Sequence, residues 1–277
     1  MQNNSTSKIA IVIASKGRPN ALAQRREVFD YQTVKPCAVV YSVSDDADLP
    51  NEQFLFSPHI IVKGPAGSSK QRNRGLEQIL STCEIVVFFD DDYIPAKNCL
   101  ENILNFMKAN PGVVGANGHL LLDGINGQAV DFEEGKKLLA DHVRDVQPDF
   151  ASMKDLIGLY GCNMAFRSAA IGNIRFDEKL PLYSWQEDID FATQVGRKGR
   201  TVATQSFVGI HQGIKASRSP GRQLGYSQIA NPTYLIRKGT MPLIFGLKMM
   251  VKNFISNHVR AFRPESWVDR KGRAIGC

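Results

Sequence analysis

Four short runs of apolar residues, rich in Val and Ile, constrain the fold of this chain more than any other feature. They occupy residues 9–14, 37–43, 59–62 and 84–89. Runs of this length are typical of strands that are buried on both faces. Segments that read as helices follow the first, third and fourth runs, at residues 21–31, 70–80 and 95–108. Because strands that alternate with helices favour a mostly parallel sheet flanked by helices, we predict an α/β fold.

The second half of the chain is less regular. We expect further strands at residues 113–118, 119–122, 161–167 and 200–207, a helix at 185–198 and an exposed charged stretch at 131–144. No tract rich in Pro, Gly or Ser marks a linker between domains. We therefore predict one α/β domain over residues 1–235, followed by a basic amphipathic extension over residues 236–277.

The formal net charge of the 277 residues is +7, and it is unevenly distributed. Residues 1–196 contain 19 basic and 25 acidic side chains, a net of −6, whereas residues 197–277 contain 15 and 2, a net of +13. With 43% hydrophobic and 22% charged residues, the composition excludes a disordered chain. The basic segment predicts an anionic partner, which could be nucleic acid, a phosphorylated small molecule or an acidic membrane surface.

The cysteines and the N-terminus favour a cytoplasmic protein. Five cysteines are scattered without a Cys-x-x-Cys pair, so we expect reduced thiols rather than a disulfide framework or a zinc finger. The polar N-terminus makes a poor signal peptide. The best candidate for a spanning segment, residues 241–255, is interrupted by Lys248 and Lys252, so we expect no membrane-spanning helix.

Three consecutive carboxylates, Asp90, Asp91 and Asp92, directly follow the fourth apolar run. Adjacent carboxylates repel one another unless a cation or several hydrogen-bond donors neutralise them. Because side chains alternate along a strand, Asp90 and Asp92 point to the same side and could bind a hard divalent cation such as Mg²⁺ or Mn²⁺. The alternative is a solvated acidic turn.

A Gly- and Ser-rich loop at residues 64–69 leads into a helix start that carries Lys70, Arg72 and Arg74. Backbone donors, the helix dipole and cationic side chains together favour an anion such as a diphosphate. The spacing is neither that of a Walker P-loop nor that of a dinucleotide-binding turn. A solvated basic helix start is the alternative.

A second acidic group, Glu187, Asp188 and Asp190, begins another predicted helix. Carboxylates at this place either compensate the helix dipole or, in a pocket, act as a general base toward a hydroxyl. His211 follows the predicted strand at 200–207. A lone His is more often structural, but a metal site with aspartates from only one strand needs further ligands.

These motifs follow one another in a defined order: SKGRP after the first strand, DD after the second, GSSKQRNRG at a helix start, DDD after the fourth strand and WQED before a helix. In this order they resemble the family 2 glycosyltransferases of the GT-A fold, over residues 8–213. The resemblance implies the Rossmann-like GT-A form of the α/β fold. It also implies an inverting, metal-dependent hexosyltransferase.

By the same resemblance, a nucleotide-diphosphate sugar would bind at the carboxyl ends of the strands. The residues that would bind this donor are Ala14, Ser15, Arg18, Asp45, Lys70, Arg72, Asn73, Asp90 and Asp91. After the second strand the chain has SVSDDAD where the family usually has an Asp-Gly-Ser turn, so Asp46 is the alternative to Asp45.

The resemblance further implies a metal site and a general base. Asp92 would be the direct ligand of Mn²⁺ or Mg²⁺ on the diphosphate, with Asp90 nearer the ribose and His211 completing the site. Asp188, beside Glu187, would take the proton of the acceptor hydroxyl as that hydroxyl attacks the anomeric carbon from the opposite face. The metal and cationic side chains would neutralise charge on the departing nucleoside diphosphate.

The basic extension contains two notable segments. A loop at residues 211–222, with Lys215, Arg218 and Arg222, could close over the donor phosphates, or it could be a mobile solvated loop. Residues 241–262 have apolar residues near helical spacing with basic residues between them, which predicts an amphipathic helix in an anionic membrane interface. Packing of this helix on the core or on a partner subunit is the alternative.

If the helix binds a membrane, family analogy points to a saccharide linked to polyprenyl diphosphate as the acceptor. Such an enzyme would make a bacterial exopolysaccharide or cell-surface polysaccharide at the inner face of the cell membrane. Three other functions compete: a nucleotidyltransferase that forms nucleotide sugars, a non-catalytic sugar-nucleotide binder and a nucleic-acid-binding protein. The Gly-rich signature usual in nucleotidyltransferases is absent, and the acidic body argues against a nucleic-acid partner.

Overall fold

The computed structural model describes residues 8–180, 184–215, 220–265 and 267–277. In this part of the chain, nine strands form one sheet in the order β3-β2-β1-β4-β8-β6-β9-β5, with β7 paired to β9 off this path. The strands are β1 (Ile9–Ala14), β2 (Ala38–Val43), β3 (His59–Lys63), β4 (Ile85–Asp90), β5 (Tyr93–Pro95), β6 (Val113–Asp123), β7 (Met153–Asp155), β8 (Asn163–Arg167) and β9 (Arg200–His211).

Most strands of the sheet run in one direction. Strands β1, β2, β3 and β4 pair in parallel, and β6 and β9 share their direction because β8 is antiparallel to both β4 and β6. Only β5, β7 and β8 among the described strands run the opposite way. The predicted α/β fold with a mostly parallel sheet is therefore confirmed. Ala14 lies opposite both Ser42 and Asp90, so the strand ends that carry the polar motifs are level with one another.

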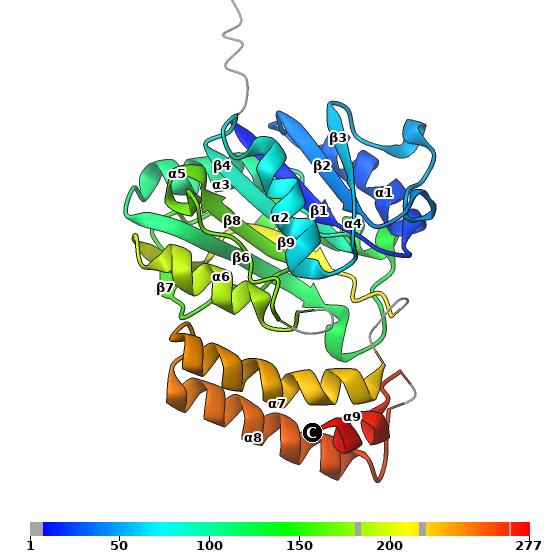
Figure 1. The fold of residues 1–277 in the computed structure, drawn as a ribbon. Helices are drawn as coiled ribbons and strands as arrows, with labels where there is room; N and C mark the ends of the chain where they lie inside the picture. The colour runs from blue at the N-terminus through cyan, green and yellow to red at the C-terminus, as the bar shows by residue number, and fades with distance from the viewer. Residues whose placement is uncertain (1–7, 181–183, 216–219, 266) are drawn as a thin grey trace, which may run out of the picture.

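Helices cover both faces of the sheet (Figure 1). Residues of β1 alternate between two cores: Ile11 packs with helices α1, α3 and α4, whereas Val12 packs with α2, α5 and α6. At Gly75 of α2, a Cβ atom would lie 2.4 Å from Val12 Cγ1, so this glycine lets α2 approach β1 closely. The helices are α1 (Pro19–Asp30), α2 (Ser68–Ile79), α3 (Cys99–Ala109), α4 (Phe132–Asp145), α5 (Ser168–Ile171), α6 (Glu187–Gly196), α7 (Gly221–Lys238), α8 (Leu243–Arg260) and α9 (Arg270–Gly276).

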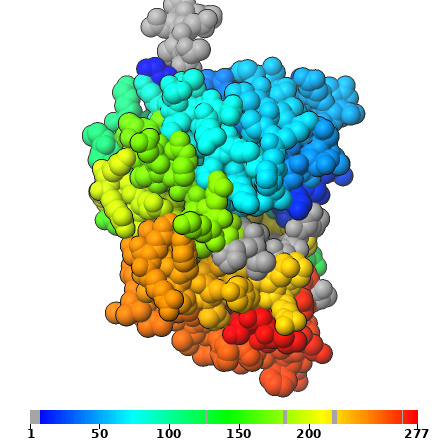
Figure 2. Space-filling model, in the orientation of Figure 1, coloured from blue at the N-terminus to red at the C-terminus, as the bar shows by residue number. Residues whose placement is uncertain are grey.

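The last three helices, α7 to α9, lie together at one end of the molecule (Figures 1 and 2). Helix α7 lies between the α/β body and α8, and a small cluster of Leu180, Leu235 and Met241 with Ile189 joins it to α6. The predicted boundary between the α/β domain and the C-terminal extension, at residue 235, lies inside helix α7. Among the described helices, none combines the length and the apolar character that crossing a membrane requires.

Several local predictions are wrong in their limits. The two strands expected at 113–118 and 119–122 are one strand, β6, and β9 continues past residue 207 to His211. The stretch at 131–144, expected to be exposed, is helix α4, whose start is capped by Asp131 and which buries Phe132 and Leu139. Helix α7 begins at Gly221, inside the segment interpreted as a loop.

Candidate active site

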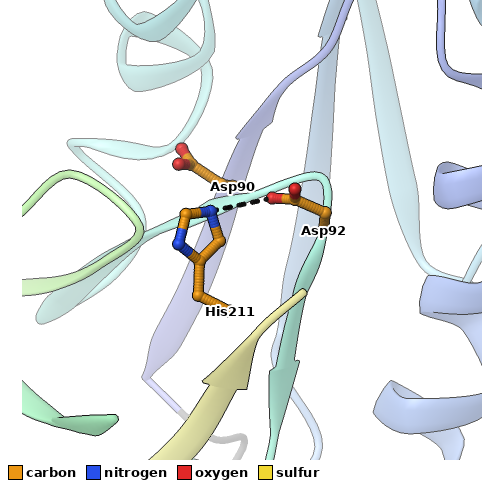
Figure 3. A group of neighbouring side chains, drawn as sticks. All are labelled: Asp90, Asp92 and His211. Carbon is orange, nitrogen blue, oxygen red and sulfur yellow. Dashed lines mark ion pairs between the residues drawn. The ribbon is translucent and has the colours of Figure 1, made fainter. Parts of the chain in front are cut away.

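The carboxyl ends of β4 and β9 bring three possible metal ligands together. Asp90 ends β4, Asp92 lies in the turn after it, and His211 ends β9. One ligand atom from each residue lies within 4.8 Å of the other two (Figure 3). His211 Nε2 is 3.3 Å from a carboxylate oxygen of Asp92. The three residues predicted as metal ligands are therefore neighbours, although His211 is far from the aspartates in the sequence.

Two residues that the sequence did not indicate orient the ring of His211. Its Nδ1 lies 2.8 Å from a carboxylate oxygen of Asp123 and 3.3 Å from the hydroxyl of Tyr160, which leaves Nε2 directed toward Asp92. Burial lowers the pKa of His211, but the hydrogen bonds to Asp123 and Asp92 outweigh burial and raise it to about 10. Asp123 directly follows the predicted strand at 119–122, and this placement is the signal that could have identified it. Tyr160 has no such signal.

The middle carboxylate of the triplet, Asp91, has its hydrogen-bond partners outside this cluster. It accepts hydrogen bonds from the Ser15 hydroxyl at 2.6 Å and from the Arg18 guanidinium at 2.8 Å, which ties the end of β1 to the turn after β4. Burial is the main cause that raises the pKa of Asp91 to about 6. Asp92 is also buried, but the hydrogen bond and charge of His211, together with the charge of Arg18 and the amide of Ile214, outweigh burial and lower its pKa to about 2. The pKa values of these two neighbouring carboxyls are thus shifted in opposite directions.

Arg72 on α2 links the group of candidate metal ligands to the second acidic group. Its guanidinium donates to Asp90 at 2.9 Å, to Glu187 at 2.8 Å and to the carbonyl of Gly161 at 3.0 Å. The side chain is almost fully buried and lies over the ring of Phe176. Burial lowers the pKa of Arg72, but the surrounding carboxylates more than offset this and raise it. Arg72 therefore stays charged between two carboxylates.

Glu187 and Asp188 begin α6 and have different partners. Glu187 accepts a hydrogen bond from Arg72 and another, of 2.6 Å, from the hydroxyl of Ser68. Its Oε1 therefore accepts two hydrogen bonds. Asp188 is half-buried and accepts from two backbone amides, those of Gly161 and Ile189, each at 2.8 Å. Burial raises the pKa of both carboxyls, that of Glu187 to about 7. Carboxyls with raised pKa values are suited to accept a proton near neutral pH.

The backbone before Glu187 is unusual. Ser184 and Gln186 have φ angles of 71° and 76°, in the left-handed region that non-glycine residues seldom adopt. Between them, the carbonyl of Trp185 accepts a hydrogen bond of 2.8 Å from Asn231, a fully buried residue of α7. Helix α7 thus contacts the turn that carries the acidic pair.

The other predicted donor-binding residues have varied surroundings. Ala14 ends β1 and is half-buried, and Lys70 lies exposed in α2. Asn73 is buried, and its amide bonds with the backbone of Phe176 and with Glu178. The role of these residues toward a donor stays a prediction.

The turn after β2 is organised by a residue that was not predicted. Asp45 is exposed and caps a short 3₁₀ turn, Asp46–Asp48, by accepting from the amide of Ala47. Asp46 pairs with Lys63. The buried carboxylate is Asp48, which accepts from the backbone amides of Gly17, Ser44 and Asp45. Asp48 therefore joins the turns after β1 and β2, whereas Asp45 faces solvent.

The basic residues after β9 are distributed between two regions. The Lys215 ammonium bonds to the carbonyls of Gly124 and Ile125, in the turn after β6. Arg222 lies exposed in the first turn of α7 and lines a hollow of about 360 Å³ between α7 and α9. Arg218 lies outside the described residues.

Asp190, an alternative to Asp188 as the base, is fully buried and pairs with Lys238 of α7 at 2.8 Å.

The chemistry of the cluster fits a divalent cation. Two carboxylates supply hard oxygen ligands of the kind that Mg²⁺ and Mn²⁺ take, and the imidazole, which must lose its Nε2 proton to bind a metal, adds a ligand suited to a transition metal. Asp123 supports His211 from behind, as outer-shell carboxylates support histidine ligands of metals. Asp90 keeps 36% of its side chain exposed, so the cluster is open on the side of this residue. The arrangement can hold a cation that also binds an anionic ligand.

Comparisons with known proteins agree with this fold. Residues 45–172 match the model of the family described as Glycosyl transferase family 2. None of the curated proteins matches the chain. The structure of S. aureus TarS 1–349 in complex with UDP-GlcNAc is similar, with a TM-score of 0.56 and 14% identity, and the match covers 96% of this chain and 78% of that chain.

Two further structures are similar. Mannosyltransferase PcManGT from Pyrobaculum calidifontis, in complex with GDP-Man and Mn²⁺, has a TM-score of 0.53 and 15% identity, with 93% and 76% coverage. A longer S. aureus TarS structure has a TM-score of 0.53 and 16% identity, and the match covers 94% of this chain but only 44% of that one. At these identities the likeness establishes a shared fold.

Proposed function

We propose that this chain, which has the GT-A fold, is an inverting, metal-dependent transferase of glycosyltransferase family 2. It would move a sugar from a nucleotide-diphosphate sugar to a hydroxyl group of a saccharide. The support for a nucleotide-sugar donor is that the similar TarS and PcManGT structures contain UDP-GlcNAc and GDP-Man.

One observation carries the proposal: Arg72 connects a candidate metal cluster with a candidate base. On one side it bonds to Asp90, a member of the cluster with Asp92 and His211. On the other side it bonds to Glu187, the chain neighbour of Asp188. The metal ligands must contact the diphosphate while the base contacts the attacking hydroxyl, so both must lie close enough to reach the same bound donor and acceptor.

The side chains divide the work as follows. Asp90, Asp92 and His211 would hold Mn²⁺ or Mg²⁺, and the bound cation would neutralise charge on the leaving diphosphate. Arg72 holds Asp90 and Glu187 in place by two charged hydrogen bonds. Ser15 and Arg18 fix Asp91, and thereby the turn that presents Asp92.

Asp188 would act as the general base. Its carboxylate bonds only to backbone amides among the contacts of the described residues, whereas Glu187 is held by Arg72 and Ser68 and Asp190 by Lys238. Burial raises its pKa, which strengthens its affinity for a proton. Removing the proton of an acceptor hydroxyl as it attacks the anomeric carbon would give inversion in a single displacement.

We further propose that the acceptor is a saccharide linked to polyprenyl diphosphate, used in bacterial polysaccharide synthesis at the inner face of the cell membrane. The support is the exposed apolar and basic surface of the C-terminal helices, described in the next section. This step is an analogy with family members, because a fold alone does not specify an acceptor.

The test is release of nucleoside diphosphate. The purified protein is incubated with UDP-, GDP- and dTDP-sugars, a panel of saccharide acceptors and Mn²⁺ or Mg²⁺, after a thermal-shift screen has selected the nucleotide. We expect one donor to release its nucleoside diphosphate in the presence of an acceptor. EDTA should abolish this release and added Mn²⁺ or Mg²⁺ should restore it, because the leaving group carries the charge that the cation neutralises.

The competing functions give different results. A nucleotidyltransferase would release pyrophosphate from a nucleoside triphosphate and a sugar 1-phosphate. A sugar-nucleotide binder would show the thermal shift without any release. Full transfer in the presence of EDTA would contradict the role of Asp90, Asp92 and His211 as metal ligands.

A further inference from the structure

The outer side of α8 exposes a row of apolar side chains. Ile244, Val259 and Phe262 are 68%, 63% and 88% exposed. Soluble proteins seldom leave so many apolar side chains together in water without a function. The whole set, which we call the α8 face, consists of Leu243, Ile244, Leu247, Val251, Phe254, Ile255 and Val259 of α8 and Phe262 in the turn that follows it.

The spacing and the packing of α8 both show that this face points outward. Leu243, Leu247 and Val251 are four residues apart, which places them in one row on the helix. The buried residues of α8 lie on its other side: a Cβ at Gly246 would meet Ile236 of α7 at 2.6 Å, and Asn257 donates to Gln228 of α7 at 2.7 Å. Helix α7 lies between the body and α8 (Figure 1), so the apolar row, on the side of α8 opposite to its contacts with α7, points away from the body.

Basic side chains accompany the apolar row. Lys248, Lys252 and Arg263 are exposed, and α8 contains no acidic residue. The two acidic residues after α8 have partners within the C-terminal helices. Glu265 pairs with Arg260 and Arg270, and Asp269 caps α9. The surface is therefore apolar and cationic at once.

We infer that the α8 face binds an anionic membrane surface, with the helix axis parallel to the membrane plane. Apolar side chains would enter the boundary between headgroups and acyl chains, and Lys248 and Lys252 would contact anionic headgroups. A helix of this kind lies in the membrane interface and does not span the bilayer.

Charge favours a membrane over a second copy of the chain. A dimer formed through two α8 faces would bring the Lys248 and Lys252 of both copies together, and no acidic residue of α8 could compensate them. Like charges that face each other in an interface oppose association. An anionic lipid surface supplies the opposite charge over the whole face.

The test is flotation of the full-length protein with vesicles, and it requires no donor, acceptor or catalysis, so it is independent of the proposed transferase function. Vesicles of phosphatidylcholine alone are compared with vesicles that also contain phosphatidylglycerol. We expect flotation with the anionic vesicles only. Lys248→Glu with Lys252→Glu should weaken partitioning by about tenfold or more, and Val251→Ser with Ile255→Ser should weaken it similarly.

The matched control is Lys154→Glu with Lys179→Glu, which makes the same change in net charge at exposed positions of the α/β body. It should float as the wild-type protein does, and unchanged thermal melting should show that each variant is folded. Failure of the wild-type protein to float with anionic vesicles would overturn the inference. So would a dimer, measured by analytical ultracentrifugation, that Val251→Ser with Ile255→Ser converts to a monomer.

Discussion

Asp188 and Glu187 are adjacent in the chain, but only one of them is free to change its partner during a reaction. Glu187 neutralises the buried guanidinium of Arg72, and removing that charge would leave Arg72 with Asp90 as its one remaining hydrogen-bonded carboxylate. Asp188 accepts from two backbone amides, which orient its carboxylate without neutralising it. At the residue scale this difference favours Asp188 as the proton acceptor.

We expect Asp188→Asn to lower turnover by about 10²-fold or more, because an amide cannot accept the proton of the acceptor hydroxyl. Donor binding, measured by thermal shift, should change little. Asp155→Asn, which alters an exposed ion pair with Arg200, is the matched control and should keep wild-type turnover. Near-normal turnover of Asp188→Asn, together with a large loss in Glu187→Gln, would transfer the role of base to Glu187.

The sequence predicts the residues of this site better where they directly follow a strand. Asp90, Asp92 and His211 follow apolar runs, and they are neighbours in the structure. Asp48 and Tyr160 are different, because each sits in an irregular segment whose path depends on contacts with distant residues. No local pattern can identify such residues, since their surroundings form only when the chain has folded.

At the scale of elements, α7 connects the catalytic body to the outer helix. Asn231 donates to the carbonyl of Trp185, between the two residues with positive φ, and Lys238 pairs with Asp177 and Asp190. Backbone in this conformation costs about 1–3 kcal/mol per residue and persists only where surrounding contacts hold it. We therefore assign Asn231 as a positioning residue for the turn before Glu187 and Asp188.

Asn231→Ala should reduce kcat by about tenfold with a smaller change in the KM for donor, because a displaced base slows the chemical step more than it weakens binding. It should also destabilise the protein by about 1–3 kcal/mol, since a part-buried carbonyl loses its partner. Steady-state kinetics and thermal melting measure the two effects.

Thr233→Ala is the control for this prediction, because the Thr233 hydroxyl bonds to the carbonyl of Ile229 in α7 and to the sulfur of Met250 in α8, and not to the turn before Glu187. This variant should keep the wild-type kcat. If Asn231→Ala were destabilised to the expected extent but kept its kcat, Asn231 would have only a structural role.

Helix α7 also shows why some elements cannot be predicted from local sequence. Its segment contains two glycines and Pro232, which favour a loop. In the structure a Cβ at Gly225 would lie 2.1 Å from the carbonyl oxygen of Arg273, so this glycine allows close contact between α7 and α9. The short apolar strands can be predicted without knowledge of distant contacts, because a continuous run of apolar residues by itself indicates a strand that is buried on both faces.

At the scale of the whole molecule, the uneven charge corresponds to two ends with different tasks. The acidic body contains the carboxylates of the candidate site, and the basic end contains α8 with its apolar face. Helix α7 is the layer between them, and packed helices are about 8–10 Å apart. Asp188 lies at the start of α6, and α6 packs on α7 through Ile189. If the α8 face lies on a membrane, two helix layers therefore separate Asp188 from the headgroups, a distance on the order of 20 Å that a saccharide extending from a lipid can cover.

This arrangement predicts that membrane binding matters only for acceptors in a membrane. With a donor and saccharide that support nucleoside diphosphate release, transfer to a polyprenyl-linked acceptor in anionic vesicles is compared with transfer to its short-chain, water-soluble analogue. Lys248→Glu with Lys252→Glu should lower the first rate about tenfold more than the second. The reason is that the variant is less concentrated at the vesicle surface, whereas its active site is unchanged. Equal losses of rate on both acceptors would instead mean that the two lysines contribute to the stability of the fold or to the transfer reaction itself. Equal retention on both would mean that the α8 face does not deliver the enzyme to its acceptor.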